Sequence, residues 1–256
     1  MKHWDSSHYL RYSTERTRAA VDLLARVNLP APRRIADIGC GPGNSTALLW
    51  SRWPDSKVVG IDNSSEMLAT ARTAYPEREW IECNARQWRP SKPYDLVFSN
   101  AALQWLPEHS SLVQMLFEQV ATGGALAFQV PSAQYALVRR LIFEISQESP
   151  WDQQMQGPRS RLTIEPPEFY YDALASEAET LDIWETDYMH VMESHEAILD
   201  WISSTGLRPF LNALDTDADR EAFTNELRHR IASGYELRID GKVLFPFRRT
   251  FVIAYR

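Results

Sequence analysis

Five short apolar runs alternate with helical patterns in the first half of the chain, and this alternation limits the fold more than any other feature. The runs are RRIADI (33–38), KVVGID (57–62), EWIEC (79–83), YDLVFSN (94–100) and GALAFQV (124–130). Helical patterns follow the first two runs, and another covers 108–121. Because the runs lack a polar–apolar alternation, we expect both faces of each strand to be buried. The sequence therefore predicts an α/β fold with a parallel, doubly wound sheet.

Less regular segments flank this core on both sides. A helical pattern over 15–27 precedes the first run, and strand patterns over 181–191 and 242–256 come late in the chain. A hairpin turn is expected at Asp240-Gly241, before the last strand. We expect three segments. Residues 1–32 form an N-terminal helical cap, 33–133 form a ligand-binding core, and 134–256 hold the remaining strands with helical insertions.

Charge and composition exclude several classes of partner. The chain carries a formal net charge of −7, and no dense run of Lys and Arg offers the basic surface that nucleic acid needs. Cys40 and Cys83 lack a metal-ligand spacing, and the six histidines include no HExxH motif. The N-terminus lacks the apolar stretch of a signal peptide, and no window approaches the ~20 apolar residues of a membrane span. We therefore expect a cytoplasmic protein with a small-molecule partner and no metal, and the oligomeric state stays open.

The stretch IADIGCGPGNST (35–46) joins the first strand to the first helix, and three classes of ligand use such a turn. A mononucleotide P-loop needs GxxxxGK[ST], but no lysine follows Gly43. A dinucleotide site needs GxGxxG, whereas the third glycine here comes one residue early. Asp37 also stands where a dinucleotide fold keeps an apolar residue. The third ligand, S-adenosylmethionine, is favoured.

The DIGCGPG stretch at 37–43 resembles the nucleotide-binding motif of class I methyltransferases. The resemblance implies a Rossmann-like sheet and a carboxylate at Asp62 that accepts both ribose hydroxyls of S-adenosylmethionine. It also implies adenine contacts from Met67 and from Asn84, which stands where the family usually has an acid. The implied cofactor-binding residues are Asp37, Gly39, Gly41, Gly43, Asp62, Asn63, Met67, Asn84, Ala85 and Asn100.

Each of these features alone has a structural alternative. A glycine turn can be only a tight turn, Asp62 can cap the helix that follows it, and Trp105 can be a core residue. Their joint placement at four successive strand ends favours a methyltransferase. A protein that binds S-adenosylmethionine without turnover is the alternative from another class, and product formation would decide between the two.

The chain resembles the trans-aconitate 2-methyltransferase family over nearly its whole length. The segments that carry the resemblance are YLRYSTERTR, DIGCGPGNSTALL, NAALQWLPEH, GGALAFQVP, DIWETDY, WISSTGLRPFL and RRTFVIAYR. The match is less clean at Trp4-Asp5-Ser6 and over 134–165, which are regions that can line a substrate pocket. The resemblance implies methyl transfer to a carboxylate oxygen of trans-aconitate, which gives a monomethyl ester and S-adenosylhomocysteine.

A carboxylate acceptor sets the chemistry of such a site. It is already ionised at pH 7, so no general base is needed and we name no catalytic acid or base. Catalysis is expected from holding oxygen, methyl and sulfur in line and from excluding water.

A tricarboxylate substrate needs cationic side chains around it, and arginine suits carboxylates. Any single arginine can equally be a surface residue. The helical insertions are expected to cover the substrate site. The predicted substrate-binding residues are Tyr12, Arg16, Gln104, Trp105, His109, Arg208, Arg248 and Arg249. The alternative substrate is another small carboxylic acid or a natural product.

Overall fold

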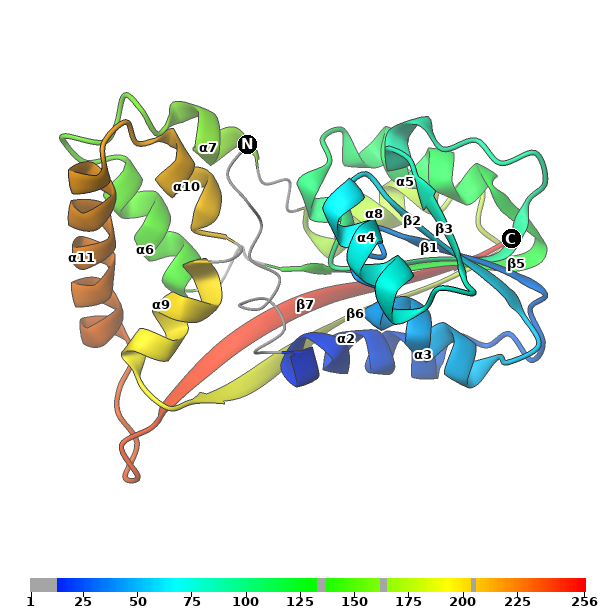
Figure 1. The fold of residues 1–256 in the computed structure, drawn as a ribbon, viewed down its shortest axis with the longest axis horizontal. Coiled ribbons are helices and arrows are strands. Elements are labelled where there is room, and N and C mark those ends of the chain that lie inside the picture. The colour runs from blue at the N-terminus through cyan, green and yellow to red at the C-terminus, as the bar shows by residue number, and fades with distance from the viewer. Residues whose placement is uncertain (1–12, 133–136, 162–164, 204–205) are drawn as a thin grey trace. The chain divides into compact units, whose positions relative to one another are not determined.

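The computed structural model describes residues 13–132, 137–161, 165–203 and 206–256, and the chain divides into two compact units (Figure 1). The sheet unit comprises, of the described residues, 16–131, 165–185 and 249–256. The helical unit comprises 13–15, 132, 137–161, 186–203 and 206–248. Each unit has its own hydrophobic core, and each is described by itself.

Across the described ranges, seven strands form one sheet in the order β3-β2-β1-β4-β5-β7-β6. The strands are β1 (Arg34–Ile38), β2 (Lys57–Asp62), β3 (Glu79–Glu82), β4 (Tyr94–Asn100), β5 (Val120–Pro131), β6 (Thr180–Met192) and β7 (Val243–Tyr255). Strands β1 to β5 pair in parallel, whereas β7 pairs antiparallel with β5. The predicted α/β fold is confirmed, but the sheet is mixed rather than wholly parallel because β7 runs in the reverse direction.

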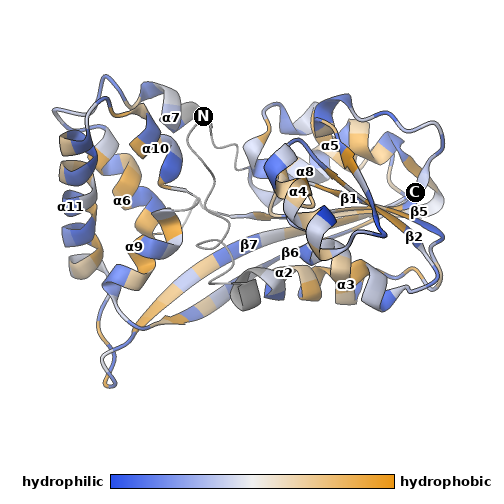
Figure 2. Cartoon of the chain, in the orientation of Figure 1, coloured by the Kyte–Doolittle hydropathy of each residue, from blue (hydrophilic) through white to orange (hydrophobic). Residues whose placement is uncertain are grey.

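Helices cover both faces of the strands in the sheet unit. They are α2 (Ser13–Arg26), α3 (Asn44–Arg52), α4 (Ser65–Ala74), α5 (His109–Glu118) and α8 (Pro167–Leu174), with short 3₁₀ helices η1 (Ala85–Gln87) and η2 (Leu103–Trp105). Helices α2 and α3 lie on one face, and α5 and α8 lie on the other (Figure 1). Because helices cover both faces of the sheet, every residue of β1 after Arg34 is buried. Figure 2 shows the hydrophobic character of the central strands.

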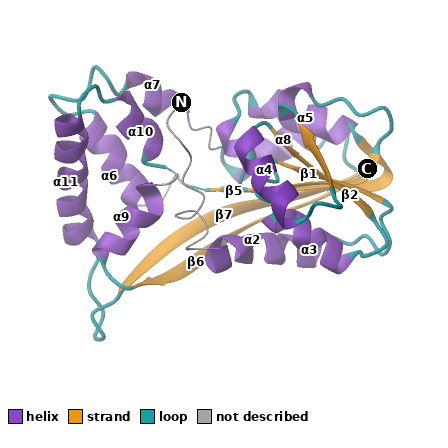
Figure 3. Cartoon of the chain, viewed as in Figure 1, coloured by secondary structure: helices purple, strands orange, loops and turns teal. Residues whose placement is uncertain are grey.

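In the residues that the structure describes, the helical unit contains five helices, and four of them contribute residues to the second core. The five helices are α6 (Leu137–Ser146), α7 (Gln156–Arg161), α9 (His195–Ser203), α10 (Arg208–Ala213) and α11 (Asp217–Gly234). Helix α11 buries Phe223, Leu227 and Ile231, which are spaced four residues apart and so share one face. After α11, the chain turns at Gly241 (φ +79°), where the Arg238 N–H donates to the Lys242 carbonyl over 2.7 Å (Figure 3). The expected turn at Asp240-Gly241 is therefore confirmed.

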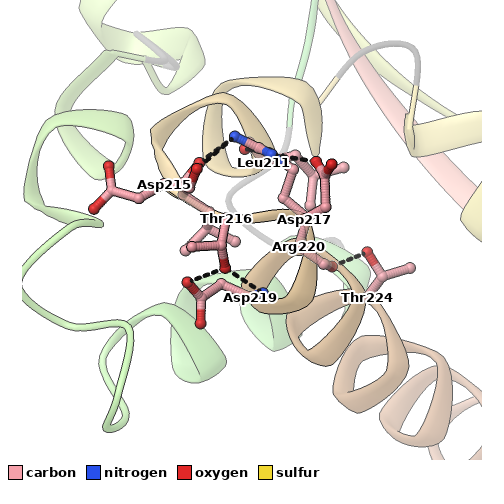
Figure 4. A network of polar contacts seen from close by, with 8 residues as sticks. Leu211, Asp215, Thr216, Asp217, Asp219, Arg220 and Thr224 are labelled. Atoms are coloured by element: carbon pink, nitrogen blue, oxygen red, sulfur yellow. Dashed lines mark hydrogen bonds and ion pairs between the residues drawn. The ribbon is translucent and has the colours of Figure 1, made fainter.

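A polar network fixes the start of α11 (Figure 4). The Thr216 hydroxyl accepts from the Asp219 N–H over 3.0 Å and donates to the Asp219 carboxylate over 2.6 Å, which caps the helix. Arg220 donates to the Leu211 carbonyl over 3.1 Å and pairs with Asp217. These bonds satisfy backbone groups at the α10–α11 turn, so this network has a structural explanation. Of the helices that the structure describes, none is long and apolar enough to cross a membrane.

Candidate functional site

Three glycines with positive φ shape the turn between β1 and α3. Gly39 has φ +69°, and a Cβ there would lie 2.2 Å from the Cβ of Ala102. Gly43 has φ +96°, and its Cβ would lie 2.8 Å from the Trp80 ring. Gly41 has φ +55°, but its Cβ would meet no atom within 4 Å. Packing therefore requires glycine at the first and third positions, whereas Gly41 borders open space that a ligand can occupy.

Asp37, the second-last residue of β1, is a fully buried carboxylate, and one of its two oxygens accepts hydrogen bonds from the protein. Its Oδ2 accepts hydrogen bonds from the Ser45 hydroxyl over 2.7 Å and the Thr46 hydroxyl over 2.6 Å. Its Oδ1 is buried without a hydrogen-bond partner. Burial raises the pKa of Asp37 from 3.8 to about 6, because the charged form loses its hydration. The carboxylate is thus mainly ionised at pH 7, and its Oδ1 can accept from a cationic ligand group.

Asp62 ends β2 and contacts the glycine turn directly. Its Oδ2 accepts from the Gly41 N–H over 2.8 Å, and its Oδ1 accepts from the Ser64 N–H over 2.9 Å. The residue is half-buried, and each carboxylate oxygen has a further lone pair for a ligand hydroxyl. Asn63 beside it is exposed, and Met67 is half-buried in the first turn of α4.

Asn84 follows β3 and caps η1. Its Oδ1 accepts from the Arg86 N–H over 3.0 Å, so the amide oxygen already has one partner. Ala85 is the first residue of this 3₁₀ helix and is half-buried. The Cys83 N–H donates to the Asp62 carbonyl over 2.9 Å, which joins the ends of β2 and β3. The structure thus brings the turns after β1, β2 and β3 together at one edge of the sheet.

The end of β4 lies against the same turn. Ala101 has φ +52°, a left-handed conformation that is uncommon for a residue with a Cβ. Its N–H donates to the Gln129 carbonyl over 3.0 Å, and its carbonyl accepts from Gln104 Nε2 over 2.7 Å. Gln104 is 4% exposed, and its Oε1 is buried without a partner. The neighbouring residue, Ala102, is the one that closely approaches Gly39.

His109 and Trp105, both predicted to bind substrate, occupy different surroundings. His109 is 2% exposed, with Nε2 and the Leu103 carbonyl 2.8 Å apart and Nδ1 and the Tyr170 hydroxyl 2.8 Å apart. Because a carbonyl only accepts, Nε2 carries the proton and Nδ1 accepts from Tyr170. Burial lowers the pKa of His109. Both ring nitrogens of His109 thus have partners within the protein, which is consistent with a structural role, and the predicted contact with substrate stays a prediction. Trp105 is 43% exposed.

The three predicted arginines after residue 200 differ in their surroundings. Arg249 of the sheet unit is 5% exposed, and its Nη1 donates to Gln129 Oε1 over 3.3 Å. Arg248 of the helical unit binds Asp187 through two hydrogen bonds of 2.8 Å, which hold the pKa of that carboxyl below its usual value. Arg208 begins α10 and is half-buried.

For two predicted substrate residues, Tyr12 and Arg16, the structure describes no side chain. Tyr12 lies outside the described residues. Arg16 lies in α2, but its side chain is not among those described. Their predicted roles therefore stay predictions.

Sequence reasoning missed polar residues that support the site. Ser45 and Thr46 hold Asp37, and Gln129 contacts both Asn100 and Arg249. A signal existed for Gln129, since it is the one polar residue in the run GALAFQV. Tyr170, the partner of His109, gave no such signal because it lies 61 residues away in the sequence.

The assembled residues fit a cofactor with a cationic group and hydroxyl groups. The buried Oδ1 of Asp37 lacks a partner, the Asp62 carboxylate has spare lone pairs, and the space beside Gly41 is open. All three features belong to the sheet unit and lie at the carboxyl ends of neighbouring parallel strands, where open α/β sheets bind ligands.

Comparison with known proteins places this geometry in a family. Residues 35–124 match a family described as "Methyltransferase domain". Trans-aconitate 2-methyltransferases from Azoarcus sp. and Rhodopseudomonas palustris are 44% and 42% identical to the chain, and each match covers 100% of both proteins. A solved Haemonchus contortus phosphoethanolamine N-methyltransferase 2, in complex with S-adenosyl-L-methionine, has a TM-score of 0.57 at 14% identity. That match covers 93% of this chain and 52% of the other, and at this identity it shows the fold alone. The chain belongs to the trans-aconitate 2-methyltransferase family.

Proposed function

We propose that this protein transfers the methyl group of S-adenosylmethionine to a carboxylate oxygen of trans-aconitate, giving a monomethyl ester and S-adenosylhomocysteine. The observation that carries the substrate is the full-length similarity, at 44% identity, to a protein named trans-aconitate 2-methyltransferase. We further propose a cytoplasmic enzyme whose partner is a small tricarboxylate rather than nucleic acid, since the net charge is −7.

Different residues at the carboxyl edge of the sheet bind different groups of the cofactor. When bound, S-adenosylmethionine supplies a methyl group on a positively charged sulfur, which a carboxylate oxygen can attack. Asp37 Oδ1 accepts from the ammonium group of the cofactor, and Asp62 accepts from its ribose hydroxyls. Gly41 leaves room for the cofactor beside the turn. Met67 and Asn84 contact the adenine.

Binding the acceptor acid is a matter of charge and position. A carboxylate is ionised at pH 7, so the protein needs no base and contributes by holding the acid in line and excluding water. Arg249 offers a fixed positive charge within the sheet unit. Arg208 and Arg248, with the segment 134–256 that contains them, are proposed to contribute the remaining contacts, and Arg248 is already paired with Asp187.

Replacing Asp62 by alanine is expected to weaken binding of S-adenosylhomocysteine by about 1.5–3 kcal/mol, the range for hydrogen bonds to charged groups. The variant also loses the bond to the Gly41 N–H, so its thermal unfolding midpoint is measured beside titration calorimetry. Exposed Asp55, which precedes β2, supplies the matched control variant Asp55→Ala, with parental affinity expected. Parental affinity in folded Asp62→Ala would remove this residue from the site.

Asn84 offers a test of the adenine contact. Asn84→Asp keeps an acceptor for the Arg86 N–H and adds a charged acceptor, so it is expected to bind S-adenosylhomocysteine at least as tightly as the parent. Asn84→Leu loses both contacts and is expected to bind about tenfold more weakly. Calorimetry on the three proteins distinguishes these outcomes, and equal affinities would place Asn84 away from the adenine.

The proposed function is tested by measuring S-adenosylhomocysteine formation with a panel of mono-, di- and tricarboxylates. The proposal expects turnover with trans-aconitate and much lower kcat/KM for acids that lack its three carboxylates. Preference for a different small acid would replace the substrate but keep the reaction. Binding of the cofactor without turnover on any acid would favour a non-catalytic protein.

A further inference from the structure

Three polar side chains from neighbouring strands form a chain of hydrogen bonds inside the sheet unit. Arg249 Nη1 of β7 donates to Gln129 Oε1 of β5 over 3.3 Å, and Gln129 Nε2 donates to Asn100 Oδ1 of β4 over 2.6 Å. Gln129 is 0% exposed and Arg249 is 5% exposed, whereas Asn100 is half-buried. The strand register pairs Asn100 directly with Gln129.

The chemistry of the guanidinium group fixes both amides in this chain. Arg249 has donors but no acceptor, so Gln129 must turn its amide oxygen toward it. The NH₂ group of Gln129 then faces Asn100, which must present its own oxygen in return. Consequently the NH₂ group of Asn100 lies on the side away from Gln129. The orientation of the Asn100 NH₂ group is thus set through Gln129 by Arg249, because a guanidinium group cannot accept a hydrogen bond.

The backbone next to Asn100 is held by the same glutamine. The Gln129 carbonyl accepts from the Ala101 N–H over 3.0 Å, and Ala101 has φ +52°. Ala102, the next residue, approaches Gly39 closely enough that a Cβ there would lie 2.2 Å away. Asn100, the last residue of β4, is therefore followed directly by a fixed turn, and this turn lies beside the glycine turn of the proposed cofactor site.

We infer that Gln129 is a positioning residue, which orients the Asn100 amide so that its NH₂ group donates to a carboxylate bound at the carboxyl end of β4. The inference rests on the proposed function. The carboxylate belongs either to the acceptor acid or to the amino-acid end of the methyl donor, since both present the same chemistry to an N–H donor.

Two substitutions of Gln129 separate this role from simple packing. In Gln129→Glu, the introduced carboxylate still accepts from Arg249 but cannot donate, so Asn100 must turn its NH₂ group inward and its oxygen outward. We expect at least tenfold weaker binding of the carboxylate ligand, with little change in the unfolding midpoint. In Gln129→Leu, Asn100 is free to turn either way, while Arg249 loses this acceptor. Compared with Gln129→Glu, we expect Gln129→Leu to lose less affinity for the carboxylate ligand and more stability.

A double-mutant cycle removes the effect of the added charge on Arg249. Asn100→Ala deletes the amide whose orientation is in question. If orientation is the cause, Asn100→Ala should lower affinity by much less in the Gln129→Glu protein than in the parent. Gln114→Glu is the matched control, because Gln114 is a half-buried amide of the same unit that donates to the Ala173 carbonyl over 3.0 Å. The control is expected to keep parental affinities.

The readouts are the KM for trans-aconitate, the Kd for S-adenosylhomocysteine, and the unfolding midpoint. A loss confined to KM assigns the carboxylate to the acceptor acid, and a loss confined to Kd assigns it to the donor, and either result supports the inference. Unchanged constants in Gln129→Glu, an additive cycle, or a loss of affinity that follows stability would overturn it. Absence of turnover by the parent would instead count against the proposed function, while the titrations with S-adenosylhomocysteine would still test Gln129.

Discussion

The Gly41→Ala variant is expected to fold but to bind S-adenosylhomocysteine at least tenfold more weakly than the parent, or about 1.4 kcal/mol. Its added methyl group meets no protein atom within 4 Å, so it enters the space that we assign to the cofactor. The left-handed conformation at φ +55° costs an alanine about 1–2 kcal/mol of stability. Binding should therefore suffer in a protein that is still folded.

Gly39→Ala is the matched variant for this experiment and should show the opposite balance. Its Cβ would lie 2.2 Å from the Cβ of Ala102, so strain from φ +69° combines with a severe overlap. The two effects together are expected to cost about 2–5 kcal/mol of stability. Chemical unfolding and calorimetry on both variants test the pair. Parental affinity in Gly41→Ala would mean that the turn does not face the cofactor.

Affinity for S-adenosylmethionine is expected to rise as pH rises through about 6, the pKa of Asp37. The ionised carboxylate presents an acceptor at Oδ1, whereas the protonated form does not attract an ammonium group. At pH 5 only about a tenth of the protein would be in the competent form, so the Kd should be about tenfold higher than at pH 8. Titration calorimetry across this range measures the effect.

Asp37→Asn should flatten this profile and bind weakly at every pH. The raised pKa of Asp37 also predicts how the stability of the ligand-free protein depends on pH.

Folding raises the pKa from 3.8 to about 6, so the folded state holds the proton of Asp37 more tightly than the unfolded state does. The resulting contribution to the free energy of unfolding is fully present below pH 3.8 and is lost as pH rises through 6. The loss amounts to about 3 kcal/mol. Asp37→Asn should therefore stabilise the free protein more at pH 8 than at pH 4, and a pH-independent difference would contradict the assignment.

Much of the sheet could be predicted because its strands are bounded by charged residues and turn residues. Strands β2 and β4 cover the predicted 57–62 and 94–100, since apolar runs of this length have few alternative registers. The start of β5 at Val120, rather than at residue 124, could not be predicted. A register shift between Tyr94 and Leu96 lets β4 pair with Val120, and such irregular pairings leave little trace in a single sequence.

The sequence could predict which residues lie at the strand ends, but it could not predict their hydrogen-bond partners. The carboxyl ends of parallel strands must meet at one edge, which is why Asp37, Asp62 and Asn100 could be grouped from the sequence. Gln129 could not be added, because its contacts with Asn100 and Arg249 depend on the register of three strands. His109 was ambiguous for a similar reason, as both of its hydrogen-bond partners are set by folding.

The most direct measurement of the central claim is identification of the product. The protein is incubated with S-adenosylmethionine carrying a ¹³C-labelled methyl group and with an equimolar mixture of trans-aconitate, cis-aconitate and citrate, and the acids are then analysed by mass spectrometry and NMR. Our account predicts that the label appears in a methyl ester of trans-aconitate and that S-adenosylhomocysteine forms in equal amount. Label on another acid, or cofactor binding with no labelled ester, would contradict it.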